Sequence, residues 1–142
     1  MKWRQSANDR RERGSVAVEF ALLLPVLLLL VFGIIDFGRA INDQITLTQA
    51  AREGVRLAAL GQSAATVQSR VTLAANPLTP VTSTVTLACG PGAPGNADAI
   101  VTVTYNFSFI TPVGAFAAMF GTASFGSVPK MLTATGEMPC ET

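Results

Sequence analysis

The sequence predicts an α+β protein: a long N-terminal helix, half membrane-spanning and half amphipathic, then a short helix and a small antiparallel sheet of about three strands. Three observations predict this class. Residues 15–35 form an apolar run with a single charge, and residues 37–60 repeat polar side chains at helical spacing. Residues 81–89 and 99–109 alternate apolar and polar side chains, as strands do. The 142 residues suffice for one domain with an appendage.

Charge is scarce and unevenly distributed along the chain. Ten Lys and Arg and nine Asp and Glu make up 13% of the residues, against roughly 25% in ordinary soluble domains. Residues 1–13 alone carry five positive and two negative side chains. This pattern excludes an ordinary soluble globule, and the 49% of apolar residues exclude a disordered chain. The short terminal basic cluster does not suit a nucleic-acid binder.

Catalytic and metal chemistry have few candidate residues in this sequence. There is no histidine and there are two cysteines, so no nucleophile–histidine pair and no histidine-containing zinc site can form. The acidic residues beyond residue 60 are too scattered for a catalytic carboxylate pair (Asp98, Glu137 and Glu141). We therefore expect a protein that is not an enzyme and that uses no cofactor or metal.

The apolar run at 15–35 is long enough to cross a bilayer. A helix over residues 16–35 would be about 30 Å long, which matches the hydrocarbon core. Five basic side chains precede it, whereas Asp36 and Arg39 follow it with no net charge. The positive-inside rule then places the N-terminus in the cytoplasm and everything beyond residue 36 outside. We expect one membrane pass.

Three interpretations of this segment stay open from the residues alone. It is a signal anchor, or a secretory signal cleaved at Gly38-Arg39-Ala40, although the helical pattern continues unbroken through Ala40. The third interpretation starts from Glu19, because a carboxylate inside the membrane costs free energy and no targeting step needs it. Glu19 then marks a functional site, unless it only reaches back to water or to Arg13.

Residues 37–60 should continue as a helix outside the membrane. Their apolar surface lies on more than one side and includes Phe37, Ile41, Ile45, Ala51, Val55 and Ala58. Part of it should pack on the chain's own C-terminal residues, and small residues at 50, 51, 54, 58 and 59 would let helices of other subunits approach. Gly61 should end this helix, and Ser63 should cap a second helix over about 64–75.

The remaining residues predict a sheet. Strict alternation over 81–89 places Val81, Ser83, Val85, Leu87 and Cys89 on one face. Residues 99–109 form a second strand, residues 129–138 a weaker third, and residues 90–97 a turn or loop. Thr111–Phe125 is apolar, Gly-rich and nearly uncharged, and both a short helix from Pro112 and a loop that docks on the membrane or a neighbour stay open for it.

Cys89 and Cys140 both fall in step with the inward-facing positions of their predicted strands. Two cysteines outside the cytoplasm favour a disulfide, with a pair of unpaired buried thiols as the alternative. Closing a loop of about 50 residues would stabilise the fold by roughly 4 kcal/mol.

The stretch GSVAVEF from Gly14 to Phe20 resembles the prepilin-peptidase site of type IV pilin-like proteins. That pattern is a basic leader ending in Gly, a glutamate at the fifth mature position and an aliphatic helix. The resemblance implies cleavage between Gly14 and Ser15. It also implies that Glu19 meets the α-amine of a neighbouring subunit and thereby sets the subunit register.

Further residues extend the resemblance to the TadE-like minor pseudopilins of Tad/Flp pilus systems. They are Asp36, Gly38 and Arg39 after the apolar run and Arg52, Glu53, Gly54 and Arg56 beyond it. Asp36 stands where that family often has Glu, and the resemblance covers about residues 12–60. It implies a pilus assembly component in the inner membrane or the pilus. Its partners would be prepilin peptidase, other pilin-like subunits, the inner-membrane assembly platform and the lipid bilayer, but not nucleic acid.

Four regions are expected from these features: a basic cytoplasmic leader (1–14), a transmembrane helix (15–36), an extracytoplasmic helical stalk (37–76) and a small β-rich module (77–142). The rival interpretation is an uncleaved single-span protein whose outer domain binds a ligand or scaffolds a complex. The mature N-terminus separates the two.

Overall fold

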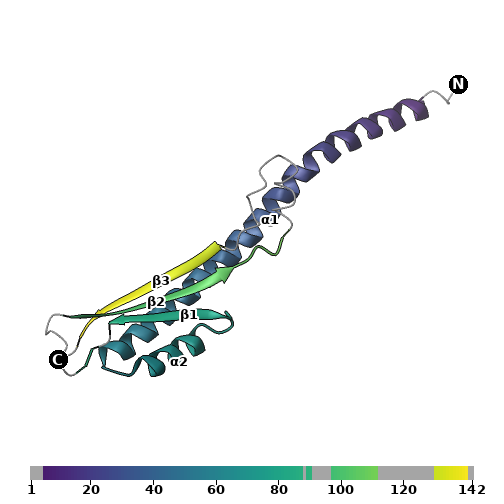
Figure 1. Cartoon of the computed structure of the whole chain (residues 1–142). Coiled ribbons are helices and arrows are strands. Elements are labelled where there is room, and N and C mark those ends of the chain that lie inside the picture. The colour runs from purple at the N-terminus through teal and green to yellow at the C-terminus, as the bar shows by residue number, and fades with distance from the viewer. Residues whose placement is uncertain (1–4, 88, 91–96, 112–129, 141–142) are drawn as a thin grey trace.

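The computed structural model describes residues 5–87, 89–90, 97–111 and 130–140. Its elements in chain order are α1 (Gln5–Ala59), α2 (Ala64–Ala74), β1 (Val81–Leu87), β2 (Asp98–Phe107) and β3 (Lys130–Pro139). In Figure 1 the N-terminal half of α1 projects alone, and the sheet and α2 lie along its C-terminal half. The α+β class is confirmed, as are the long helix, the short helix and the three strands.

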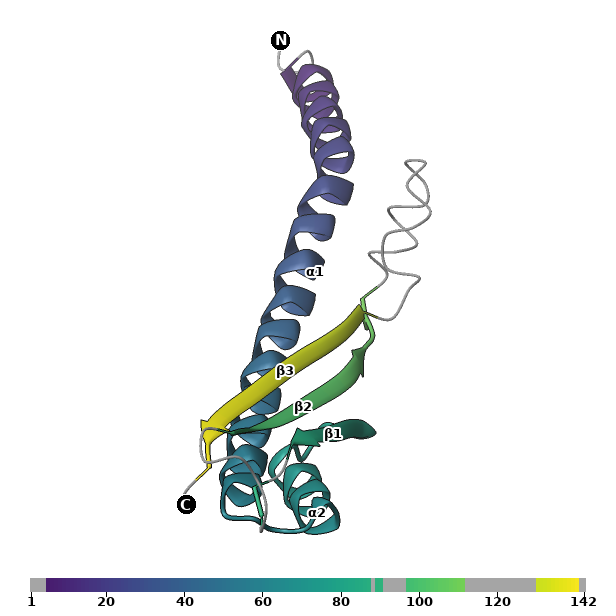
Figure 2. The same cartoon turned by 60° about the vertical axis from the view of Figure 1, so that its left-hand side comes forward.

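The sheet is antiparallel, in the order β1-β2-β3. At its centre Val103 of β2 pairs with Ser83 of β1 and with Ala134 of β3. One face of the sheet packs on α1, and α2 contacts both α1 and β1 (Figure 2). This arrangement puts α1 at the centre of the fold, because α2, β2 and β3 all pack on it, while β1 is held by β2 and α2.

Both helix boundaries expected after residue 59 are confirmed. Gly61 has φ +70°, a left-handed conformation that favours glycine, and a Cβ there would come within 2.8 Å of the Cys89 carbonyl oxygen. Ser63 caps α2, and its hydroxyl accepts a hydrogen bond from the Thr66 amide at 3.3 Å. The turn between the helices therefore folds α2 back against α1.

The apolar surface of the second half of α1 divides between two sides. One side is buried against α2 and the sheet, in a core formed by Leu47, Ala50, Ala51, Val55, Ala58, Val67, Val71, Val101 and Val103. The other side stays open, with Phe37 72%, Ile41 53% and Ile45 53% exposed. The chain's own C-terminal residues thus cover only part of the apolar surface, as the pattern of more than one apolar side predicts.

Two glycines allow close packing around α1. A Cβ on Gly136 of β3 would lie 2.7 Å from the Ala51 carbonyl oxygen and 3.0 Å from Val55 Cγ1. A Cβ on Gly54 would lie 2.5 Å from Val71 Cγ2. Glycine at these positions lets β3 and α2 approach α1 more closely than any other residue would.

The predicted alternation of the first strand is wrong at its end. The register shifts between Val85 and Leu87, so Leu87 pairs with Ile100 instead of Ala99. A β-bulge inserts one residue into one strand, which reverses the side-chain parity beyond it. The prediction for Thr111–Phe125 lies outside the described residues beyond Thr111.

Candidate functional site

The predicted processing site lies on an uncovered stretch of α1. Gly14, Ser15 and Glu19 are exposed, and the helix runs continuously through the bond between Gly14 and Ser15. Residues four apart share a helix face, so Ser15 and Glu19 lie on the same side of α1, about 6 Å apart along its axis. Ser15 and the Glu19 carboxylate therefore face the same neighbouring space.

The apolar stretch beyond Glu19 has no cover either. From Gly14 to Ala59, α1 is long and apolar enough to cross a membrane, and none of the residues of its most apolar 18-residue window is buried. Pro25 lies inside it without breaking the helix. A helix that exposes so many large apolar side chains to water would aggregate. This long apolar N-terminal helix suggests a membrane anchor.

Asp36 forms a buried junction where this apolar stretch ends. It is 2% exposed, and its carboxylate accepts hydrogen bonds from the Ile110 amide at 3.3 Å and from the Thr111 hydroxyl. Arg39, one turn further along α1, pairs with the carboxylate at 3.5 Å. The Arg39 guanidinium also lies 5.4 Å from the ring centroid of Phe107, a cation–π contact. These contacts fix the end of β2 to α1.

We expect Asp36→Asn to lower the free energy of unfolding by about 1 kcal/mol, because hydrogen bonds to a charged acceptor are roughly twice as strong as neutral ones. Asp98→Asn is the matched control, since Asp98 is exposed. Urea unfolding followed by Tyr105 fluorescence measures both variants in a Trp3→Phe background, where Tyr105 is the sole Tyr or Trp. Equal midpoints for the two variants would mean that the junction adds nothing to stability.

The second family motif has two roles in the structure, divided among Arg52, Glu53, Gly54 and Arg56. Gly54 is buried where α2 crosses α1, and Glu53 pairs with Arg70 of α2 at 3.5 Å. Arg52 and Arg56 are exposed and line a groove on the outer side of α1, together with Gln49, Arg70, Glu137 and Met138. Gly54 and Glu53 therefore contact α2, while Arg52 and Arg56 are available to solvent or to a partner.

Gly38, unlike Gly54, has no packing role among the residues that the structure describes. It is exposed, and a Cβ on it would meet nothing within 4 Å. Gly33 is equally open, and both line a shallow apolar hollow on α1 with Leu29, Leu30, Ile34, Phe37 and Ile41. This part of the helix surface is smooth, apolar and uncovered.

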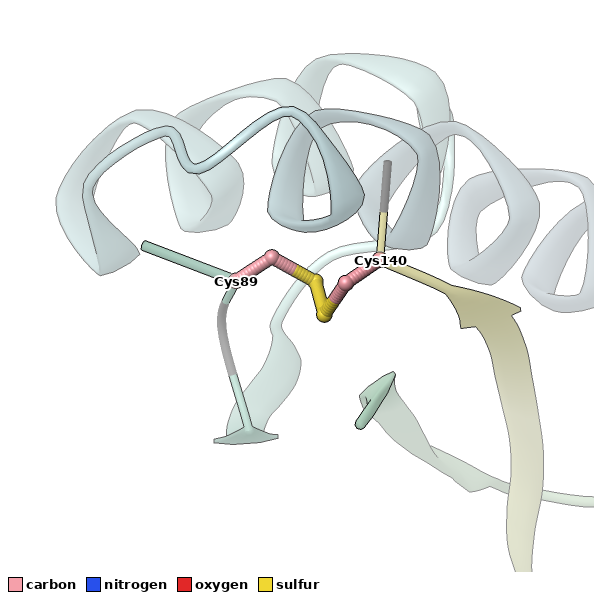
Figure 3. The surroundings of a disulfide bond; sticks show 2 residues. All are labelled: Cys89 and Cys140. Carbon is pink, nitrogen blue, oxygen red and sulfur yellow. A yellow bond between two sulfur atoms is a disulfide. The ribbon is translucent and has the colours of Figure 1, made fainter. Parts of the chain in front are cut away.

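Cys89 and Cys140 are joined by a disulfide, with their Cα atoms 5.5 Å apart (Figure 3). It connects the segment after β1 to the end of β3, below the C-terminal turns of α1. The amide of Cys89 donates to the Ala58 carbonyl at 3.1 Å, and the amide of Cys140 donates to the Ala97 carbonyl at 3.0 Å. The disulfide expected from the sequence is therefore present, and both cysteines are also held by their backbones.

The structure adds functional neighbours that the sequence does not reveal. Ile110, Thr111 and Phe107 contact the Asp36–Arg39 pair, and Arg70 contacts Glu53. No local pattern points to Ile110, Thr111 or Phe107, because more than 60 residues separate them from Asp36 and Arg39. Among the residues that the structure describes, no three potential metal ligands lie together.

Comparison with known proteins concerns the same helix. Residues 14–56 match the TadE-like protein family. No curated protein and no solved structure matches the chain. The family match suggests a protein related to the Tad pilus, with an N-terminal apolar helix, and it begins at Gly14 and ends at Arg56. Over the helix that carries Glu19 and Asp36, the chain is similar to TadE-like proteins.

Proposed function

We propose that this chain is a minor pseudopilin of a Tad-type pilus system, a non-enzymatic component that acts by packing on other subunits. The observation that carries this proposal is the open apolar surface of α1. It continues from the membrane-spanning stretch past Asp36 to Phe37, Ile41 and Ile45, on the side that the sheet and α2 leave uncovered. A single bilayer-thick run would expose apolar residues only up to residue 35.

Removal of the leader would convert a precursor into an assembly-competent subunit. Five basic residues in residues 1–13 keep the N-terminus in the cytoplasm, where prepilin peptidase reaches the bond after Gly14 at the membrane surface. Glycine within a helix costs about 1 kcal/mol relative to alanine, which favours local opening of α1 at this bond. The sheet and α2 then lie outside the inner membrane, beside the assembly platform.

Glu19 would set the register between subunits. Cleavage leaves a free α-amine on Ser15, and the Glu19 carboxylate of a neighbour can neutralise it where both are away from water. The open hollow around Gly33 and Gly38 lets a second helix approach closely at the other end of the span.

The direct test is mass spectrometry of the purified protein after co-expression with prepilin peptidase. We expect the mature chain to start at Ser15. Gly14→Leu should leave the leader in place, whereas the matched variant Gly38→Leu, at an equally open glycine, should be cut normally. An intact leader on the wild-type chain in the presence of active peptidase would favour the uncleaved single-span protein instead.

Glu19→Ala should be cleaved at the same bond but should reduce the protein recovered in pili by about tenfold or more, the effect of losing roughly 1.4 kcal/mol of subunit interaction. Asp98→Ala, which removes an exposed carboxylate from the sheet, is the control. Immunoblots of sheared pili and of membranes measure both. Normal recovery of Glu19→Ala in pili would show that the carboxylate does not set the register.

A further inference from the structure

We infer that the membrane-proximal tip of the β2–β3 pair is a second membrane contact, which inserts into the outer interface of the bilayer that α1 spans. The tip consists of Ile110, Thr111, Lys130 and Met131. The inference rests on the membrane span of the proposed function, and it adds a lipid partner for the sheet that the family match does not supply.

Contacts with α1 place the tip at the level where the helix leaves the bilayer. The Ile110 amide and the Thr111 hydroxyl both bond to Asp36, the residue that follows the last apolar residue of the span. Lys130 pairs with Phe107, whose ring lies under Arg39. Both ends of the tip therefore lie beside the helix turn 36–39.

The sheet leads away from the bilayer beyond this point. The Gln44 side-chain amide donates to the Thr133 carbonyl at 2.9 Å, and Gly136 contacts Ala51. Strand β3 thus follows α1 outward from residue 39 to residue 51, a distance of about 18 Å along the helix axis. Among the described residues of the sheet, those of the tip lie nearest to the membrane-spanning part of α1, and β2 and β3 lie beside the C-terminal half of the helix in Figure 1.

The chemistry of the tip suits a lipid interface. Ile110 is 72% exposed and Met131 67% exposed. Within the described parts of the strands and the residues that adjoin them, they are the large apolar side chains with the greatest exposure. Lys130 stands next to them, and a lysine at this depth extends its ammonium to the headgroup phosphates. The acidic neighbour, Asp36, is buried and bonded to its partners.

A second copy of the chain is the weaker occupant for this surface. A specific protein interface buries roughly 800 Å² on each partner, which two exposed side chains cannot supply. Insertion at a lipid interface has no such minimum, because the covalent link to the span holds the tip at the membrane already.

The test uses the full chain in lipid nanodiscs whose phosphatidylcholine carries bromine on the acyl chains, a short-range quencher of tryptophan. Trp3→Phe removes the native tryptophan, and one new tryptophan is introduced at a time. Ile110→Trp probes the tip, Leu27→Trp the span, and Thr84→Trp an exposed site on β1. We expect Ile110→Trp to be quenched about half as strongly as Leu27→Trp, most by bromine near the headgroup, and Thr84→Trp to be unquenched.

Met131→Asp, added to the Ile110→Trp chain, should abolish most of this quenching, whereas Thr133→Asp, two residues along the same strand, should leave it. Circular dichroism confirms that each variant is folded. Quenching of Leu27→Trp without quenching of Ile110→Trp overturns the inference and leaves the membrane span intact. Blue-shifted emission of Ile110→Trp without quenching overturns it in favour of a protein partner. Absence of quenching at Leu27→Trp overturns the span itself.

Discussion

Loss of the Cys89–Cys140 disulfide should lower the free energy of unfolding by about 4 kcal/mol, the loop-closure entropy of a cross-link that spans 51 residues. The bond joins the segment after β1 to the end of β3, the two edge strands of the sheet. Without it, the unfolded chain gains freedom, and the edge strands are held by their contacts with β2, α1 and α2 alone within the described part of the chain. Domains of this size are stable by 5–15 kcal/mol, so the effect is a large share of the total.

The variant that tests this expectation replaces both cysteines by serine, which avoids a leftover thiol. Urea unfolding of the detergent-solubilised chain, followed by Tyr105 fluorescence in the Trp3→Phe background, gives the free energy. A reductant should destabilise the wild type to the level of the double variant and should not affect the variant further. If the wild type and the double variant unfold at the same urea concentration without reductant, the cross-link does not stabilise the fold.

Gly136→Val should cost about 3 kcal/mol, because the new side chain would press β3 against the backbone of α1. The Cβ alone would lie 2.7 Å from the Ala51 carbonyl oxygen and 3.0 Å from the Ala51 carbonyl carbon. Backbone atoms inside a helix cannot move aside as a flexible side chain can, so the strand has to shift. Valine is otherwise well suited to a strand, so the loss measures the lack of space.

Thr133→Val is the matched control for Gly136→Val, since it introduces the same residue into the same strand at an exposed position. We expect it to change the free energy of unfolding by less than about 0.5 kcal/mol. The same urea titration measures both variants. A Gly136→Val chain as stable as Thr133→Val would mean that β3 and α1 can separate at little cost.

The parts of the fold with a regular period could be predicted from the sequence. The helix of α1 follows from its apolar run and its polar stripe, and β2 follows from strict alternation. The end of β1 could not be predicted, because the bulge between Val85 and Leu87 shifts the register without an obvious sequence signal. The division of the apolar surface of α1 into a buried and an open side could not be predicted, because it depends on where the sheet packs.

The candidate site was predictable only where its residues are neighbours in the sequence. Gly14, Ser15 and Glu19 form a local pattern, and so do Asp36 and Arg39. The partners of Asp36 lie 74 and 75 residues further along the chain, at Ile110 and Thr111. Such a contact depends on the whole fold, and hydrogen bonds between distant residues leave no period in the sequence.

One unbroken helix carries both Glu19 and the residues that bind the sheet. The junction at Asp36 and the hydrogen bond from Gln44 prevent the sheet from rotating around α1. The direction in which Glu19 points from α1 is therefore tied to the direction in which the sheet points, and in the proposed membrane protein this ties the span to the outer domain. Successive residues of a helix are rotated by about 100° around its axis. The angle between Glu19 and the sheet is therefore set by the number of residues between Glu19 and the part of α1 that binds the sheet. A subunit that is aligned by its span is, by the same contact, oriented at its outer surface.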